Sequence, residues 1–433
     1  MSATTQNNST FKQKIGVDRS TGRMIVLLCS IVYFISYFSR KDFAAAMASM
    51  LSDGMLDKMT GGYISMGMFI AYGAGQLISG YLGDKLKPRT LLLFGVGTTA
   101  VCNLLMPFMP SYLMIPVWTV NGLAQAMLWP PIVRILADCL DNESYVKANL
   151  IVTSAAHIAT IILYMYVPAC LAVLSWHAVF YTAAMLAAIG FVVVIVSLSA
   201  VLRSAGYSQS VTKKTDSVSQ TPTGIGMSEY MRLLLSAGII PIFICIIMMG
   251  FLRDGIETWL PTLYCEAFER DASESILISG VLPVFSIISI CLITVLRKTK
   301  LFKNEALGCA VLFGIGVAIA VPLFFMIENT DAFSRIACLV LVALIAALMH
   351  ACNFLLISCM PGRFASVGKS ATTSGFSNAC TYIGAAISMY GIPYVAEGFG
   401  WRATVGSWFF VAALGLVAAL VSAAAYTTFI KRA

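Results

Sequence analysis

Apolar stretches of about 20 residues or more, separated by short polar segments, run along the whole chain. A helix needs about 20 apolar residues to cross a bilayer, so this pattern predicts membrane-spanning helices. Several stretches exceed 25 residues, a length that indicates tilted or protruding helices. We expect twelve helices, at residues 24–51, 60–83, 90–110, 112–138, 145–173, 177–202, 233–264, 274–296, 304–327, 333–359, 369–395 and 401–429.

The composition supports a membrane protein with many spans. The 433 residues are 59% hydrophobic and 11% charged, whereas soluble domains carry about 25% charged residues. The basic residues also indicate an orientation: with the N-terminus inside, only four of the 28 Lys and Arg residues (Lys58, Arg270, Arg335 and Arg402) fall outside, against 21 inside. The polar first 23 residues lack the apolar core of a signal peptide. We therefore expect a multi-pass inner (plasma) membrane protein with both termini in the cytoplasm.

A Ser/Thr/Gly/Lys-rich segment divides the chain into two halves. Residues 203–232 indicate a cytoplasmic linker, with a six-helix bundle at 24–202 before it and another at 233–433 after it; residues 1–23 form a cytoplasmic tail. This six-plus-six arrangement is typical of major facilitator transporters, whose binding site lies near the bilayer midplane between two pseudo-symmetric halves. The predicted fold class is thus an all-α membrane protein with the major facilitator fold.

Charged residues interrupt the first helix of each half. Arg40 and Lys41 lie within YFISYFSRKDFAAAM and Arg253 within FLRDGIETWLP. A charge at the bilayer centre costs about 3 kcal/mol or more, so such residues need a purpose. An internal ion pair between helices is one. A second is anion binding, because the planar fork of an Arg suits two oxygens of a phosphate or carboxylate. Two arginines in equivalent positions favour an anionic substrate over neutral sugars or cationic drugs.

Other polar residues near these arginines are candidates for the same region. We expect Lys41 to pair across the two halves with Asp254 or Glu257, and Asp42 is a further acid that could neutralise it. His157 and His350 are either hydrogen-bonding core residues or cavity groups. Four tyrosines at apolar positions could be core or site residues: Tyr33, Tyr37, Tyr72 and Tyr382.

The sequence contains no motif that indicates a metal site, a cofactor site or an enzyme active site. The three histidines have no ligand spacing, and no Gly-rich phosphate loop follows a strand. The twelve cysteines are mostly scattered within helices and are interpreted as small packing residues. The net charge of +8 matches a cytoplasmic face on anionic lipid, so no nucleic-acid partner is needed. We expect a monomeric, gradient-driven protein with no metal and no cofactor.

Five segments resemble the organophosphate:phosphate antiporters of the major facilitator superfamily, the group of the bacterial glycerol-3-phosphate and hexose-phosphate transporters. They are YFSRKDFAAAM on the first helix, GLAQAMLWPPIVR on the fourth, SAAHIAT on the fifth, FLRDGIETWLP on the seventh and SGFSNACTYIG on the eleventh. The resemblance implies that Arg40 and Arg253 clamp the phosphate, that His157 and Tyr382 help to bind it, and that Lys41 joins an interhelical salt-bridge network.

The chain also departs from that family. Gln76 occupies the place of a second-helix Lys and becomes a candidate substrate contact, and Gly250 replaces a Tyr three residues before Arg253. The loop GDKLKPR carries Asp84 and Arg89, which resemble the gating loop of the superfamily. Because the surroundings of the two arginines change, the resemblance favours a phosphate-bearing anion without identifying its organic part.

The functional hypothesis is exchange of an organic phosphate ester, of the sugar phosphate or glycerol phosphate class, for inorganic phosphate by rocker-switch alternating access. In this hypothesis the empty carrier does not reorient because Arg40 and Arg253 repel each other. Two alternatives stay open. One is a sugar-phosphate sensor that does not transport, and the other is a proton-coupled carrier of another organic anion that uses Asp42, Asp254 or Glu257.

Overall fold

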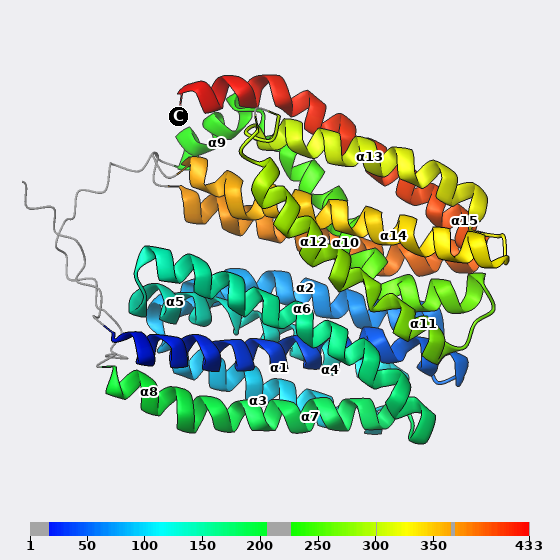
Figure 1. Cartoon of the computed structure of the whole chain (residues 1–433), viewed down its shortest axis with the longest axis horizontal. Helices are drawn as coiled ribbons and strands as arrows, with labels where there is room; N and C mark the ends of the chain where they lie inside the picture. Colours follow the sequence, from blue (N-terminus) through cyan, green and yellow to red (C-terminus); the bar gives the residue numbers. More distant parts are fainter. Residues whose placement is uncertain (1–16, 206–226, 300, 365–368, 433) are drawn as a thin grey trace, which may run out of the picture.

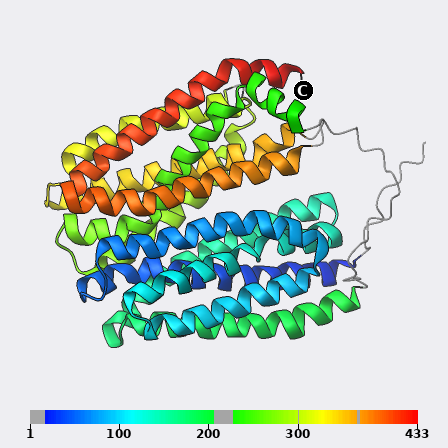
Figure 2. The ribbon, with the colours of Figure 1, turned by 180° about the vertical axis from the view of Figure 1, so that it is seen from behind.

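The computed structural model describes residues 17–205, 227–299, 301–364 and 369–432, and this part of the chain is helical with short connections. The helices run lengthwise, those of the first half forming one body and those of the second half another (Figure 1). The view from behind shows the same division (Figure 2).

The first half contains α1 (Arg19–Ser52), α2 (Lys58–Lys85), α3 (Pro88–Leu105), α4 (Ser111–Ala126), α5 (Trp129–Cys139), α6 (Asn142–Val173), α7 (Trp176–Val192) and α8 (Ser199–Ser204). The second half contains α9 (Met227–Ser236), α10 (Ile239–Ala267), α11 (Ala272–Ser279), α12 (Val281–Leu296), α13 (Glu305–Met326), α14 (Ala332–Asn353) and α15 (Ser370–Arg432). Short π-helices, Val193–Leu198 and Phe354–Cys359, continue α7 and α14.

Each of the twelve predicted stretches coincides with helical structure, so the all-α prediction is confirmed. Nine helices in the described ranges are long and apolar enough to cross a membrane. The fourth stretch is divided into α4 and α5 before Pro130, and α15 combines the last two stretches across Gly400, whose φ is 82°. The count of twelve spans stays a prediction from the sequence.

Two helices begin within the segments that the sequence interpretation assigned to the tail and the linker. Asp18 accepts hydrogen bonds from the backbone N–H groups of Ser20 and Thr21, which starts α1 at Arg19 inside the expected tail 1–23. At the other boundary, α9 begins at Met227 inside the expected linker 203–232, because the buried Tyr230 packs edge-on against Phe364. Residues 1–16 and 206–226 lie outside the described part of the chain.

Glycines bring α10 into backbone contact with α15. A Cβ at Gly250 would lie 2.2 Å from the carbonyl oxygen of Thr381, and one at Gly384 would lie 2.0 Å from that of Ile247. Such contacts let two helices approach closely and pack without an intervening side chain. Gly250 lies one turn before Arg253, so this contact also fixes the part of α10 that carries the arginine.

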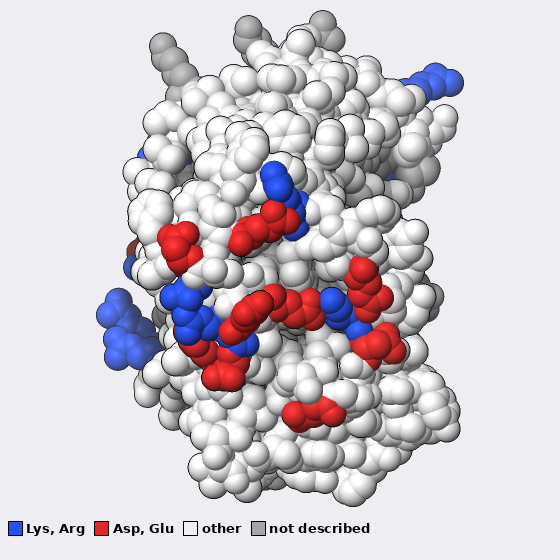
Figure 3. Space-filling view, turned by 90° about the vertical axis from the view of Figure 1, so that its right-hand side faces the viewer, with Lys and Arg blue, Asp and Glu red and all other residues white. Residues whose placement is uncertain are grey.

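The two halves meet through an ion pair and packing at one end of the molecule. Lys58, at the start of α2, contacts Glu266 near the end of α10 at 2.8 Å, and Trp401 donates to the same carboxylate at 2.9 Å. The end on the right of Figure 1 is shown in Figure 3, where acidic and basic side chains alternate across the middle of the face. Helix α11 of the second half packs against α6 and α1 of the first.

Candidate functional site

A cavity of about 660 Å³ lies between the two halves. Its wall includes Arg40 and Lys41 from α1, and Arg253 and Glu257 from α10, so the charged positions predicted from the sequence meet in one place. The wall continues to Arg297, at the end of α12, on the side away from the Lys58–Glu266 pair. The cavity therefore extends from the middle of the molecule toward the end where α6 begins.

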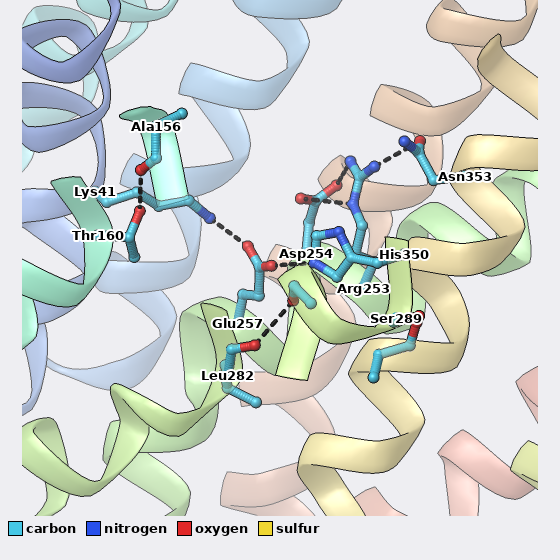
Figure 4. A network of polar contacts seen from close by, with 12 residues as sticks. Lys41, Ala156, Thr160, Arg253, Asp254, Glu257, Leu282, Ser289, His350 and Asn353 are labelled. Atoms are coloured by element: carbon cyan, nitrogen blue, oxygen red, sulfur yellow. Dashed lines mark hydrogen bonds and ion pairs between the residues drawn. The ribbon is translucent and has the colours of Figure 1, made fainter. Parts of the chain in front are cut away.

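Three N–H donors of the Arg253 guanidinium are engaged by its neighbours (Figure 4). Its Nη2 donates to Oδ2 of Asp254 at 2.7 Å and its Nε donates to Oδ1 of the same carboxylate at 3.3 Å. Its Nη1 donates to Oδ1 of Asn353 at 2.6 Å. The positive charge is thus neutralised inside the cavity, and an anion must displace Asp254 to take both donors. The expected repulsion between two bare arginines is weaker than the sequence suggested.

Arg40 has a different environment. Its guanidinium lies 4.5 Å from the ring centre of Tyr37 and 4.8 Å from that of Tyr72. Aromatic faces attract cations by about 0.5–2 kcal/mol, less than a buried carboxylate partner provides. No ion pair of Arg40 occurs among the described residues, so its charge is available to an anion.

Glu257, in the cavity wall, links the two halves. Its Oε2 lies 2.6 Å from Nζ of Lys41, and its Oε1 lies 2.6 Å from Nε2 of His350 (Figure 4). The first of these contacts joins α10 to α1, and the second joins α10 to α14. The expected Lys41 salt bridge across the halves is present, with Glu257 as the partner, while Asp254 pairs with Arg253 instead.

The two candidate histidines come together from opposite halves. The rings of His157 on α6 and His350 on α14 lie edge to face with centres 6.0 Å apart, and both line the cavity. His350 is held by Glu257, whereas His157 extends the wall on the first half. The sequence left open whether these were core or cavity groups, and the structure places both in the cavity.

The candidate tyrosines surround Arg40. Tyr33, Tyr37 and Tyr382 line the cavity. Tyr72 lies outside the wall. Its ring contacts the guanidinium of Arg40 and the ring of Tyr382, whose centre lies 4.7 Å from its own. The ring of Tyr33 packs against that of Tyr37 at 5.0 Å. These aromatic contacts hold the Arg40 side chain in place.

Two predicted site residues lie elsewhere. Gln76 is not part of the cavity wall; its Nε2 donates to the carbonyl of Ala126 on α4 at 3.4 Å. Asp42 is fully buried and takes part in no ion pair among the described residues, so the expectation that it joins a salt bridge is wrong. Its Oδ1 accepts from the backbone N–H of Phe43, and its Oδ2 has no hydrogen-bond partner. Two residues beyond Arg40, the helical rotation directs it away from the cavity.

The predicted gating loop is only partly described. The side chain of Asp84 lies outside the described side chains. Arg89 is in the first turn of α3, and within the described ranges its Nε has no hydrogen-bond partner. The gating role of Asp84 and Arg89 stays a prediction.

The sequence interpretation missed several polar residues of the cavity. Asn353 holds Arg253, and the hydroxyl of Tyr164 donates to the backbone carbonyl of Glu257 at 3.3 Å. A signal was available in both cases. Asn353 follows His350 by three residues and thus shares its helix face. Polar residues about four apart along the apolar helix α6 also line the cavity: Tyr145, Asn149, Thr153, His157, Thr160 and Tyr164.

Two helical halves around a charged central cavity define a membrane transporter rather than an enzyme. Residues 29–358 match the Major Facilitator Superfamily, and the chain belongs to that family. Solved structures agree on the fold. The nucleoside transporter NupG matches with a TM-score of 0.72 and 15% identity, over 93% of this chain and 100% of that one. A bacterial homologue of the human lysosomal transporter Spinster, in an inward-facing and unoccupied conformation, matches with a TM-score of 0.70, 14% identity and 96% and 98% coverage.

Curated relatives carry names of phosphate-ester transporters and of a sensor. The probable hexose phosphate transport protein of Chlamydia trachomatis is 32% identical over 24% of this chain and 23% of the relative. The membrane sensor protein UhpC of Escherichia coli is 30% identical over 26% of each chain. The glycerol-3-phosphate transporter of Bacillus subtilis is 26% identical over 67% of this chain and 68% of the relative. The first of these matches thus spans about a quarter of the relative's length.

The chain is therefore a membrane transporter of the major facilitator superfamily, related to sugar phosphate and glycerol phosphate transporters. The major facilitator fold and the resemblance inferred from sequence motifs are confirmed.

Proposed function

We propose that this transporter exchanges an organic phosphate ester for inorganic phosphate across the inner membrane. The observation that carries the proposal is that Arg40 and Arg253, from the first long helix of each half, line the same cavity. Arg donors match phosphate oxygens in pairs, and one Arg from each half lets a bound phosphate bridge the halves. The names of the relatives support the same substrate class.

In the proposed cycle, phosphate binds first to Arg40 and then displaces Asp254 from Arg253. A bound anion favours an orientation only through its difference in affinity between states. A phosphate that bridges both arginines therefore stabilises the state in which the halves close around it. The two halves then rock, which breaks the ion pairs Lys58–Glu266 and Lys41–Glu257 that join them here.

The orientation of the cavity fits this proposal. The wall reaches Tyr145 and Arg297, in segments that the basic-residue pattern assigns to the cytoplasm. With both termini cytoplasmic, the chain is open to the inside and closed outside by the Lys58–Glu266 pair. A monomer suffices for this cycle because both arginines come from one chain.

Two other functions compete with exchange, each favoured by one observation. The similarity to a membrane sensor protein favours a receptor that binds a sugar phosphate without moving it. The Glu257–His350 contact inside the cavity favours proton-coupled transport of another organic anion, because a carboxylate and an imidazole can exchange a proton.

Counterflow in proteoliposomes separates the three. Vesicles are loaded with radiolabelled phosphate, and a panel of phosphate esters is added outside, with protein-free vesicles and Arg253→Ala as controls. Ester-triggered efflux supports exchange and identifies the substrate class. Ester binding without efflux supports the sensor. Uptake driven by a pH gradient, with no ester-triggered phosphate efflux, supports the proton-coupled carrier, and either result would reject exchange.

A further inference from the structure

The residue that follows each cavity arginine is charged, with opposite sign in the two halves. Lys41 follows Arg40 and reaches across to Glu257 on α10, whereas Asp254 follows Arg253 and turns back onto it. The Arg253–Asp254 pair is buried, with side chains 11% and 5% exposed. It forms two hydrogen bonds, and Asn353 takes the next donor of the same guanidinium.

Asp254 occupies the donors that a phosphate would use. A carboxylate presents two oxygens in the geometry that two oxygens of a phosphate also provide, so both fit the Nε and Nη2 edge of Arg253. The arginine thus has an anionic partner within its own chain. That partner is part of the protein and cannot diffuse away.

The pair also survives a change of orientation. Arg253 and Asp254 are neighbours on α10, so the rocking of one half against the other does not separate them. The Lys41–Glu257 pair, in contrast, joins the two halves and must break or re-form. An empty cavity with Arg253 neutralised lacks one of the two positive charges whose repulsion would oppose closure.

We propose that the chain also performs net, one-way transport of its anion, because Asp254 replaces the anion on Arg253 when the empty carrier returns. This activity rests on the proposed phosphate exchange and extends it: the carrier moves a phosphate in one direction and reorients unloaded. The charge left on Arg40 is stabilised by the rings of Tyr37 and Tyr72 during that return. Net transport moves the charge of the anion across the membrane.

Asp254 should also weaken anion binding. The phosphate must displace the carboxylate from Arg253 and then lie close to it, which disfavours the loaded state. Asp254→Asn preserves the size of the side chain and removes its charge. In this variant we expect tighter phosphate binding and a fall in net transport relative to exchange.

Efflux from proteoliposomes tests this directly. Vesicles loaded with radiolabelled phosphate are diluted into buffer with phosphate, which reports exchange, or without any transportable anion, which reports net transport. Potassium and valinomycin hold the membrane potential at zero in both cases. The wild type should release label under both conditions. Asp254→Asn should lower net efflux relative to exchange by about tenfold or more, because tenfold corresponds to ~1.4 kcal/mol, a modest share of a buried ion pair.

Two further variants control the measurement. Asp254→Glu keeps a carboxylate and should retain part of the net efflux. Glu143→Gln makes the same charge change at the exposed Glu143–Lys147 pair, away from the cavity wall, and should behave as the wild type. Phosphate binding by titration calorimetry should be tighter in Asp254→Asn than in either control.

The possible failures are distinguishable. Wild-type exchange without net efflux would overturn the inference and leave the proposed exchange intact. An unchanged ratio of net efflux to exchange in Asp254→Asn would overturn the role of Asp254. The absence of both activities in folded wild-type protein would reject the exchange proposal together with this extension.

Discussion

The two halves of the cavity carry the same arginine in two different settings. Arg40 is sandwiched between the rings of Tyr37 and Tyr72 and has no carboxylate among the described residues. Arg253 is held by Asp254 and Asn353. The repeat duplicates the arginine but not its partners: Asp254 pairs with Arg253, whereas Lys41, at the matching position after Arg40, pairs with Glu257. The first half thus presents an arginine without a carboxylate partner among the described residues, and the second half presents an arginine paired with Asp254.

Removing each arginine tests that difference most strongly. Arg40→Ala and Arg253→Ala should each lower exchange by about 30-fold or more, since truncating one partner of a buried charge pair costs ~2 kcal/mol or more. Arg→Lys at either position should also fail, because a point charge lacks the bidentate fork. Initial rates of phosphate counterflow provide the measurement. Near-normal exchange in either Ala variant would reject the proposed clamp.

Arg40→Ala and Arg253→Ala should also differ in their free energy of unfolding. Arg253→Ala leaves Asp254 as a buried, uncompensated carboxylate, and we expect it to lower the free energy of unfolding by ~3 kcal/mol. The double variant Arg253→Ala/Asp254→Ala should recover much of that stability without recovering transport. Arg40→Ala should be less destabilising because no carboxylate is left unpaired. Thermal unfolding in detergent compares the three, and equal melting temperatures for both single variants would contradict the comparison.

The bridge between the halves is expected to have the next largest effect. Glu257→Gln removes the carboxylate that Lys41 and His350 share, and should destabilise this state by ~3 kcal/mol because it leaves a buried ammonium unpaired. The matched control is Glu143→Gln, which breaks the exposed pair with Lys147 and should change the unfolding free energy by less than ~0.5 kcal/mol. Similar melting temperatures for both variants would show that the Glu257 bridge contributes little.

A smaller effect on phosphate affinity is expected when the aromatic ring of Tyr37 beside Arg40 is removed. Tyr37→Phe keeps the ring and should bind phosphate about as well as the wild type. Tyr37→Leu removes the ring and with it an attraction of ~1 kcal/mol on Arg40. Phosphate affinity measured by calorimetry should therefore change by several-fold in the Leu variant only. Equal affinities in the two variants would mean that the ring does not position the arginine.

The smallest expected effect concerns Asp42, which the sequence assigned to the charged network in error. Asp42→Asn replaces a buried carboxylate, whose Oδ2 has no hydrogen-bond partner among the described residues, with a neutral amide of the same size. Removing a buried, unpaired carboxylate should raise the unfolding free energy by ~1 kcal/mol. The melting temperature in detergent measures this. A lower value would show that the charge of Asp42 is used.

Much of the fold was predictable from the sequence, because membrane helices leave a long apolar signal that needs no tertiary information. The positions of Arg40, Lys41, Arg253 and Glu257 near one site followed from the repeat of six helices. The start of α9 within the expected linker did not follow from the sequence. In the structure Tyr230 of α9 packs against Phe364, a residue of a distant segment. The prediction that Gln76 contacts the substrate was wrong. A matching position in a related family does not determine where a side chain points, and the amide of Gln76 donates to the backbone of α4.

What the sequence determined by itself was the helical class, the two halves and the presence of expensive charges within apolar stretches. Hydrophobic length and charge cost are local properties, so they can be derived from the chain order. Which charge met which was decided by the tertiary structure alone. Lys41 had two candidate carboxylates on α10 within one turn of each other, and a rotation of that helix by a few tens of degrees would have exchanged them. The packing of α10 against α15 through Gly250 and Gly384 fixes that rotation. As a result Glu257 pairs with Lys41, and Asp254 pairs with Arg253.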